Sequence, residues 1–332
     1  MKLLSASRIQ TINLHSRESA QSRFRPAFAA WVNQVRAACG AFEWVTLAYL
    51  GWLVSVIFLF RKNLPTAPLY FVVHICVAAG VVLLAWASSR SDNSVLRFCR
   101  CWYFLPLWLF LFEELTRLAH LINPGWFDSW LIRFDHALTG VYPWDWLGQF
   151  ASPALNDFMQ VMYMTYFAAL VVLPGVLYAK KEWRAFWAVL TSMALAHYTV
   201  YVIAVLLPIE SPYHAFAVLR QVPLPGGPAT WLMDLIERFG RVHGAAFPSA
   251  HVAGAFAALL GAWRYRRWLF WIHLPVLILM IVSTVYGRYH YLGDGLAGLL
   301  VGLAGFYTGH WLMNRRQSLP EIQLDRPRSA AN

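Results

Sequence analysis

The sequence predicts an all-α protein: a multi-pass transmembrane helical bundle of about eight spans, with both termini in the cytoplasm. Hydrophobic residues make up 59% of the 332 positions and charged residues only 13%, whereas soluble domains are about half apolar and about a quarter charged. The apolar residues fall in runs of about 20, the length that crosses a bilayer as a helix. Basic residues gather in short clusters between these runs, as they do between transmembrane helices.

Eight apolar segments are candidate spans. The third is the least regular because it ends in charged residues. The sixth is short and rich in alanine and glycine, which allow close helix packing and place it inside the bundle. The expected spans lie near residues 42–60, 68–88, 99–118, 156–179, 184–207, 248–263, 268–286 and 290–312.

The basic clusters set the expected orientation, because cytoplasmic loops carry an excess of Lys and Arg. With the N-terminus in the cytoplasm, five clusters fall on the cytoplasmic side: the N-terminal arginines, 90–100, 180–184, 264–267 and 315–316. Arg61 and Lys62 are the exception, since they fall on the outward side. One short exception does not outweigh five agreements.

The chain divides into five parts on this basis. In the outward segment 119–155, polar residues such as Asp128 and Asp135 alternate with Trp and Leu, which is typical of an amphipathic helix in the membrane interface. A second outward stretch, 208–247, is rich in proline and glycine and has room for a short helix at 229–239. The five parts are a basic cytoplasmic or interfacial segment (1–41), N-terminal transmembrane helices (42–118), the outward amphipathic segment (119–155), a catalytic membrane core (156–314) and a polar cytoplasmic tail (315–332).

Composition also excludes several classes of protein. The formal net charge is +11, which in a soluble protein would suggest nucleic-acid binding. Here the basic residues lie between the apolar runs, as the membrane topology explains, and no segment resembles a nucleic-acid-binding helix or sheet. The four cysteines, Cys39, Cys76, Cys99 and Cys101, show no metal-ligand or disulfide spacing and are interpreted as structural. We expect no nucleic acid, no cofactor and no metal, and we leave the oligomeric state open.

Two histidines are the strongest candidates for chemistry. His251 follows Pro248 and Ser249 at the expected start of one helix, and His290 follows the next helix, so both reach the same membrane face. A helix N-terminus presents free N–H groups that bind phosphate. Asp294, four residues after His290, shares its helix face and is placed to orient the imidazole, leaving its other nitrogen free as a nucleophile.

Phosphate ligands are expected near the same histidines. Arg288 offers a planar fork of donors suited to a phosphate, and Thr284 lies one turn before it. A zinc site built from the two histidines and Asp294 is the alternative, but an arginine beside them favours an anion over a cation.

These residues resemble the motifs of the type 2 phosphatidic acid phosphatase (PAP2) superfamily, and within it the Aur1-like inositolphosphotransferases. In that superfamily a Pro-Ser-x-His motif supplies the acid histidine, which the resemblance places at His251. A Ser-Arg, His and Asp motif supplies the nucleophile and its orienting carboxylate, here Ser283, His290 and Asp294 with the spacing intact. The resemblance covers residues 156–312 best.

The sequence departs from the superfamily pattern in two places. Thr284 replaces the arginine of the second motif, and we expect Arg288, one turn on, to stand in for it. The phosphate-binding Lys and Arg-Pro motif is not evident; Tyr213 and His214 occupy the nearest position. The expected phosphate ligands are therefore Arg288, Ser249, Thr284 and His214.

The leading hypothesis is an integral membrane phosphatase that hydrolyses lipid or polyprenyl phosphate monoesters through a phosphohistidine. The alternative is an Aur1-like phosphotransferase that moves an inositol-phosphate or other phospho-head group between lipids. A transporter or channel is a distant alternative, because intramembrane ionisable residues also bind and relay ions. We expect a plasma membrane location, in a bacterial inner membrane, with the active site on the outer or periplasmic face.

Overall fold

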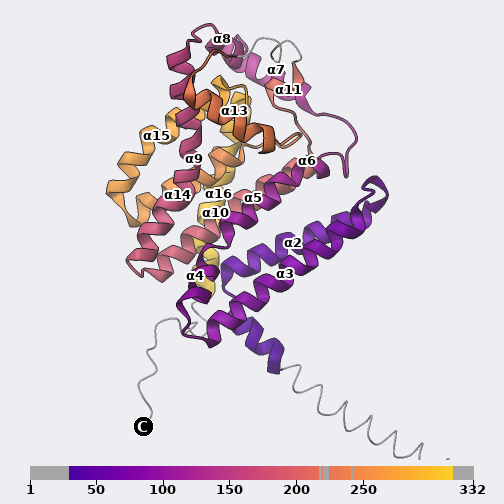
Figure 1. Ribbon diagram of the computed structural model, residues 1–332, viewed down its shortest axis with the longest axis vertical. Coiled ribbons are helices and arrows are strands. Elements are labelled where there is room, and N and C mark those ends of the chain that lie inside the picture. The colour runs from indigo at the N-terminus through magenta and orange to yellow at the C-terminus, as the bar shows by residue number, and fades with distance from the viewer. Residues whose placement is uncertain (1–29, 217–218, 220–223, 241, 317–332) are drawn as a thin grey trace, which may run out of the picture.

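The computed structural model describes residues 30–216, 219, 224–240 and 242–316, and every element labelled in Figure 1 is a helix. In these ranges no strand occurs; a single isolated bridge joins Ile209 to Ala245. Most of the predicted N-terminal segment 1–41 and of the tail 315–332 lies outside the described residues.

The predicted multi-pass class is confirmed. Seven helical stretches of the described chain are long and apolar enough to cross a membrane. They are α2 (Ala41–Leu59), α3 (Ala67–Arg90), the stretch Ser94–Leu118, α9 (Pro153–Ala179), α10 (Trp183–Leu206), α15 (Arg267–Tyr286) and α16 (Leu292–Arg316). The remaining predicted span, the sixth, is present as α14 (Ala250–Tyr265), which has only 16 residues and is the segment expected to lie inside the bundle.

The third span is made of three helices in succession, α4 (Ser94–Trp102), α5 (Phe104–Glu113) and α6 (Leu115–Leu118). Its irregular end is held by polar contacts to α3, because buried ionisable groups need partners. Glu114 Oε1 lies 3.0 Å from His74 Nε2, and Arg117 donates to the Tyr70 hydroxyl at 3.0 Å. These polar contacts therefore hold the end of the third span against α3.

The centre of the bundle is formed by α10, α14 and α16. Almost every residue of the first two turns of α14 is buried, including Ala250, Val252 and Ala253. A row of glycines on α16 lets the neighbouring backbones approach closely: a Cβ at Gly302 would lie 2.6 Å from the Ala253 carbonyl oxygen. A Cβ at Gly305 would lie 2.8 Å from the Ser192 carbonyl oxygen, so larger residues would push the three helices apart.

The short helices gather at one end of the bundle, at the top of Figure 1. They are α7 (Asp128–Thr139), α8 (Pro143–Gly148), α11 (Pro212–Ala215) and α13 (Pro228–Gly240). The helix expected over 229–239 is therefore found as α13. α14 and α16 begin at this end and α15 finishes there, whereas α4 and the connections α9–α10 and α14–α15 lie at the opposite end (Figure 1). The short helix η1 (Arg61–Asn63) joins α2 to α3.

Candidate active site

His251 and His290 meet at the end of the bundle that carries the short helices. His251 lies in the first turn of α14, and His290 lies in the turn between α15 and α16. His290 Nε2 is 3.4 Å from His251 Nδ1, and the ring centroids are 5.6 Å apart. The two imidazoles are therefore close enough to act on one phosphorus atom.

The His290 ring is held in one tautomer. Its Nδ1 lies 2.9 Å from the Ala246 carbonyl oxygen and 3.2 Å from Asp294 Oδ2. A carbonyl oxygen only accepts hydrogen bonds, so Nδ1 carries the proton and donates it. In the neutral ring Nε2 then keeps its lone pair, and this nitrogen faces His251.

Asp294 is itself fixed in place. The carboxylate is fully buried, and its Oδ2 accepts a hydrogen bond from the Tyr291 N–H at 2.7 Å. Its backbone carbonyl accepts from the Ser249 N–H at 3.0 Å, which joins the start of α16 to the start of α14. The Asp294 carboxylate is therefore placed to stabilise positive charge on the His290 ring when Nε2 forms a bond.

Ser249 links the helix N-terminus to the nucleophile candidate. Its Oγ caps α14 by accepting from the Val252 N–H at 3.4 Å and lies 3.1 Å from His290 Nε2. Because Nε2 is the acceptor, the Ser249 hydroxyl donates to it in this contact. The N-terminus of α14, with its partial positive charge, therefore lies beside the histidine pair, and helix N-termini of this kind bind anions.

Aromatic rings from α9 and α5 surround His251, which remains partly exposed. The Tyr163 hydroxyl lies 3.0 Å from His251 Nε2, and Tyr166 and Phe112 present their edges to the ring. Tyr163 also stacks on Tyr289, with ring centroids 4.4 Å apart. With Nε2 bonded to Tyr163, His251 presents Nδ1 to the point where it meets His290.

Arg288 and Thr284 each donate a hydrogen bond to a backbone carbonyl oxygen. Arg288 has a left-handed backbone (φ 63°), and its Nη1 donates to the Leu219 carbonyl at 3.0 Å. Burial lowers the pKa of its guanidinium, while Asp145 of α8 raises it. The Thr284 hydroxyl donates to the Ile281 carbonyl at 2.7 Å within α15, so its proton is engaged in the helix.

His214 lies in a second polar cluster. Its ring centroid is 3.5 Å from that of His243, and its Nδ1 lies 3.1 Å from Ser211 Oγ. His243 Nδ1 is 3.6 Å from Glu210 Oε1. Across the described ranges, no group of three or more His, Cys, Asp and Glu residues is arranged to hold a metal ion.

Asp135 supports the candidate site from α7, a role that the sequence analysis did not assign to it. From α7 it accepts hydrogen bonds from the Leu292 and Gly293 N–H groups, at 2.7 and 2.8 Å. It therefore caps α16 just beyond His290, although burial raises the pKa of its carboxyl. Gly293 permits the approach, because a Cβ there would lie 2.6 Å from Leu131 Cδ1.

We expect Asp135→Ala to lower the free energy of unfolding by about 1–3 kcal/mol, the cost of losing a helix cap and leaving buried donors unpaired. Thermal unfolding of the purified protein in detergent measures this change. Asp234→Ala, which removes an exposed aspartate on α13, is the matched control and should have little effect. Equal loss of stability in both variants would contradict the capping role.

A row of polar residues on α9 also lines the site. Gln160 accepts a hydrogen bond from the Tyr289 hydroxyl at 2.9 Å, and Asn156 donates to the Thr230 hydroxyl at 2.9 Å. Asn156, Gln160 and Tyr163 recur at helical spacing in an otherwise apolar span. That pattern is the signal that identifies this face of α9 from sequence, because polar residues inside membranes need partners.

A helical membrane fold with two histidines in contact at one end of the bundle fits a membrane-embedded enzyme that acts on phosphate esters. A family model described as the PAP2 superfamily matches residues 129–308, more than half of the chain. This protein therefore belongs to the PAP2 superfamily. The match begins at α7, earlier than the 156–312 range of the motif resemblance, and so includes Asp135. No curated protein and no solved structure matches the chain.

Proposed function

We propose that this protein is an integral membrane phosphatase that hydrolyses lipid or polyprenyl phosphate monoesters through a phosphohistidine on His290. The observation that carries the proposal is the His290 ring, whose Nδ1 proton is held by Ala246 and Asp294 while Nε2 faces His251. An imidazole nitrogen with a free lone pair, oriented by a carboxylate, is an activated nucleophile. Superfamily membership and the membrane fold fit a lipid phosphatase or phosphotransferase.

The proposed reaction has two steps. First, the His290 Nε2 lone pair attacks phosphorus, the phosphorus–oxygen ester bond breaks, and the leaving alkoxide takes the proton from His251 Nδ1. Asp294 stabilises the positive charge that develops on His290. Second, water attacks the phosphohistidine while His251 accepts its proton at Nδ1, the phosphorus–nitrogen bond breaks, and inorganic phosphate leaves.

Several groups are proposed to stabilise the phosphoryl oxygens. The Ser249 hydroxyl lies beside His290 Nε2 and caps the N-terminus of α14, and preorganised donors such as a hydroxyl and a helix N-terminus supply much of the catalysis in phosphoryl transfer. Arg288, which stands in for the missing motif arginine, is the cationic group proposed for the phosphate or its lipid linkage. Thr284 and His214 are proposed as weaker contributors, since both are engaged in local hydrogen bonds.

An apolar groove supports a lipid as the substrate. It has a volume of about 440 Å³ and lies between the end of α7, α8, α15 and the first residue of α16; ligand sites typically measure about 300–1,000 Å³. Trp146 and Leu147 face Val285 and Leu292 across it. Val285 and Leu292 flank the turn that carries His290, so a hydrocarbon chain in this groove lies beside the reacting end of the molecule.

Phosphotransfer is the second candidate function. The observation that favours it is the aromatic enclosure of His251 by Tyr163, Tyr166 and Phe112, since a site poor in water allows an alcohol to compete for the phosphohistidine. In an Aur1-like reaction the group transferred would be an inositol phosphate or another phospho-head group. Transport is disfavoured because His251, His290 and Asp294 form one contact cluster at one end of the bundle rather than a path through it.

The location is also a proposal. The basic clusters at 90–100, 180–184 and 264–267 all lie at the end of the bundle opposite to the histidines. By the positive-inside rule that end is cytoplasmic. The active site then faces the outer or periplasmic side of a plasma membrane, such as a bacterial inner membrane.

A released-phosphate assay tests the proposed function. Purified protein in detergent is offered phosphatidic acid and a polyprenyl phosphate, and then phosphatidylinositol with ceramide. A phosphatase releases inorganic phosphate from the monoesters, whereas a phosphotransferase forms a new phospholipid without releasing it. Vanadate should inhibit either reaction and EDTA neither. Absence of both products over this lipid panel, with folded protein, would rule out both functions.

Tyr163 provides a more detailed prediction. Tyr163→Phe removes one hydrogen bond to the proposed acid, and we expect a fall in kcat of about tenfold on alkyl phosphates, the worth of one such bond. The loss should be much smaller on an aryl phosphate, whose good leaving group needs little protonation. Tyr166→Phe is the matched control, because its hydroxyl bonds His197 instead of His251. Equal losses on both substrates would assign Tyr163 a packing role only.

A further inference from the structure

The short helix α13 exposes an apolar face on the side that points away from the bundle. Its buried side carries Thr230 and Met233, which are 8% and 4% exposed. Large exposed apolar side chains that gather on one face mark a contact with a membrane or with another protein. The exposed face consists of Trp231, Leu232, Leu235 and Ile236, with exposed fractions of 65%, 42%, 36% and 38%.

Polar contacts hold the other side of α13 against α9. Asp157, near the start of α9, accepts hydrogen bonds from the Gly227 N–H at 2.8 Å and from the Thr230 N–H at 3.0 Å. The Thr230 hydroxyl donates to the same carboxylate at 2.7 Å and accepts from the Asn156 amide at 2.9 Å. These contacts fix which side of α13 faces the bundle, so its apolar face is turned outward.

The exposed charged residues of α13 lie along one edge of the apolar face. Asp234 and Arg238 are both exposed, and because they are four residues apart they share one side of the helix. A short helix with an apolar face, a charged edge and a tryptophan is typical of a helix that lies in the membrane interface.

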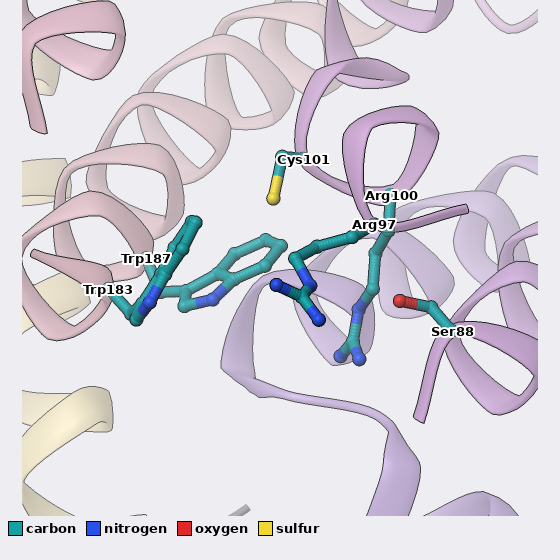
Figure 2. Close-up of a pocket in the computed structure, with 6 residues that line it drawn as sticks. All are labelled: Ser88, Arg97, Arg100, Cys101, Trp183 and Trp187. Carbon is teal, nitrogen blue, oxygen red and sulfur yellow. The ribbon is translucent and has the colours of Figure 1, made fainter. Parts of the chain in front are cut away.

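The length of α9 places α13 at a membrane boundary. Figure 2 shows the opposite boundary, where Trp183 and Trp187 of α10 line a small hollow together with Arg97 of α4; tryptophan and basic residues are typical of the membrane–water interface. α9 ends at Ala179, just before α10 begins. From Ala179 back to Asp157 the helix rises about 33 Å, at about 1.5 Å per residue, and a hydrocarbon core is roughly 30 Å thick. Asp157 and the helix that it holds therefore lie at the other boundary.

We propose that α13 is an interfacial helix, whose apolar face lies in the lipid of the leaflet at the histidine end of the bundle. Its charged edge faces the water. Lipid is favoured over a protein partner because α9 also exposes apolar side chains, Phe158 and Val161, in the turns beside Asp157. Lipid therefore already surrounds the helix to which α13 is attached.

Spin labels on single cysteines test the depth of α13 in a bilayer. The parent is the full chain with its two exposed cysteines replaced, Cys76→Ala and Cys99→Ala, and the label is introduced at Leu232→Cys or Leu235→Cys. In phosphatidylcholine vesicles each label should collide mostly with dissolved oxygen, which concentrates in hydrocarbon, and rarely with a water-soluble nickel chelate. The ratio of the two collision rates should exceed that of a label in water several-fold and place the label about 5–10 Å below the head groups.

Asp234→Cys and Arg238→Cys are the matched controls, because they place the label on the charged edge of the same helix. Their collision ratio should be close to that of a label in water. If the labels at positions 232 and 235 gave the same ratio as these controls, α13 would lie in water and the proposal would be overturned. Labels at 232 and 235 that are shielded from both reagents would show that a protein surface, such as a second copy of the chain, covers the face instead of lipid, which would overturn it as well.

Discussion

Replacing His290 with alanine is expected to reduce the rate of phosphate release by roughly 10⁴-fold or more, the typical effect of removing a nucleophile. The reason is that Nε2 forms the bond to phosphorus, and no other nitrogen of the described site is oriented in the same way by a buried carboxylate. The measurement is the initial rate of phosphate release from phosphatidic acid. Acid-labile labelling of the protein by substrate phosphate should be lost in the same variant.

Two variants control for the nucleophile assignment. His243→Ala removes a histidine at the same end of the bundle that pairs with Glu210 and lies against His214, and it should retain activity within about twofold, because this ring takes no part in the proposed bond to phosphorus. Asp294→Asn keeps the shape of the carboxylate but removes its charge, and should fall between wild type and His290→Ala. An active His290→Ala protein that still forms the labelled intermediate would exclude the proposed mechanism.

Replacing His251 with alanine is expected to reduce the rate on alkyl phosphates by roughly 10²–10⁴-fold, the usual contribution of a general acid. His251 Nδ1 lies 3.4 Å from the attacking nitrogen, so its proton is within reach of the leaving oxygen. An aryl phosphate, whose leaving group departs without protonation, should form the phosphohistidine at a rate much closer to that of wild type. Rapid-mixing measurement of the released phenol isolates this first step.

The control for His251 is His197→Ala. His197 is buried beneath the site, with Nδ1 2.8 Å from the Met193 carbonyl and Nε2 2.8 Å from the Tyr166 hydroxyl, so it should affect stability and not the choice of leaving group. If His251→Ala slows alkyl and aryl phosphates by the same factor, His251 is not the acid of the first step.

The groups proposed to react can be picked out from sequence because their spacing is local. His290 and Asp294 are four residues apart, so they share one face of a helix whatever surrounds them. Ser249 and His251 follow a proline at the start of a helix, which fixes their place in its first turn. The prediction that both pairs lie at one membrane face requires only the count of spans between them.

The supporting groups lie far away in sequence, and local patterns do not pair them. Asp135 caps α16 from a helix 157 residues earlier, and Tyr163 reaches His251 across 88 residues. The Ala246 carbonyl that fixes the His290 tautomer comes from a loop 44 residues away. A backbone carbonyl carries no sequence signal at all, so only the folded chain reveals it.

Composition and hydropathy alone determined that this chain is a helical membrane protein, because a segment without water must satisfy its own backbone hydrogen bonds as a helix. Short-range motifs also singled out the two imidazoles and the carboxylate that we propose carry the chemistry. Tertiary structure decided which nitrogen of each ring faces the reaction, where Arg288 and Thr284 direct their donors, and which distant residues hold the site together. All three features depend on the distances between helices. Close packing of the whole bundle sets those distances, and no run of neighbouring residues encodes them.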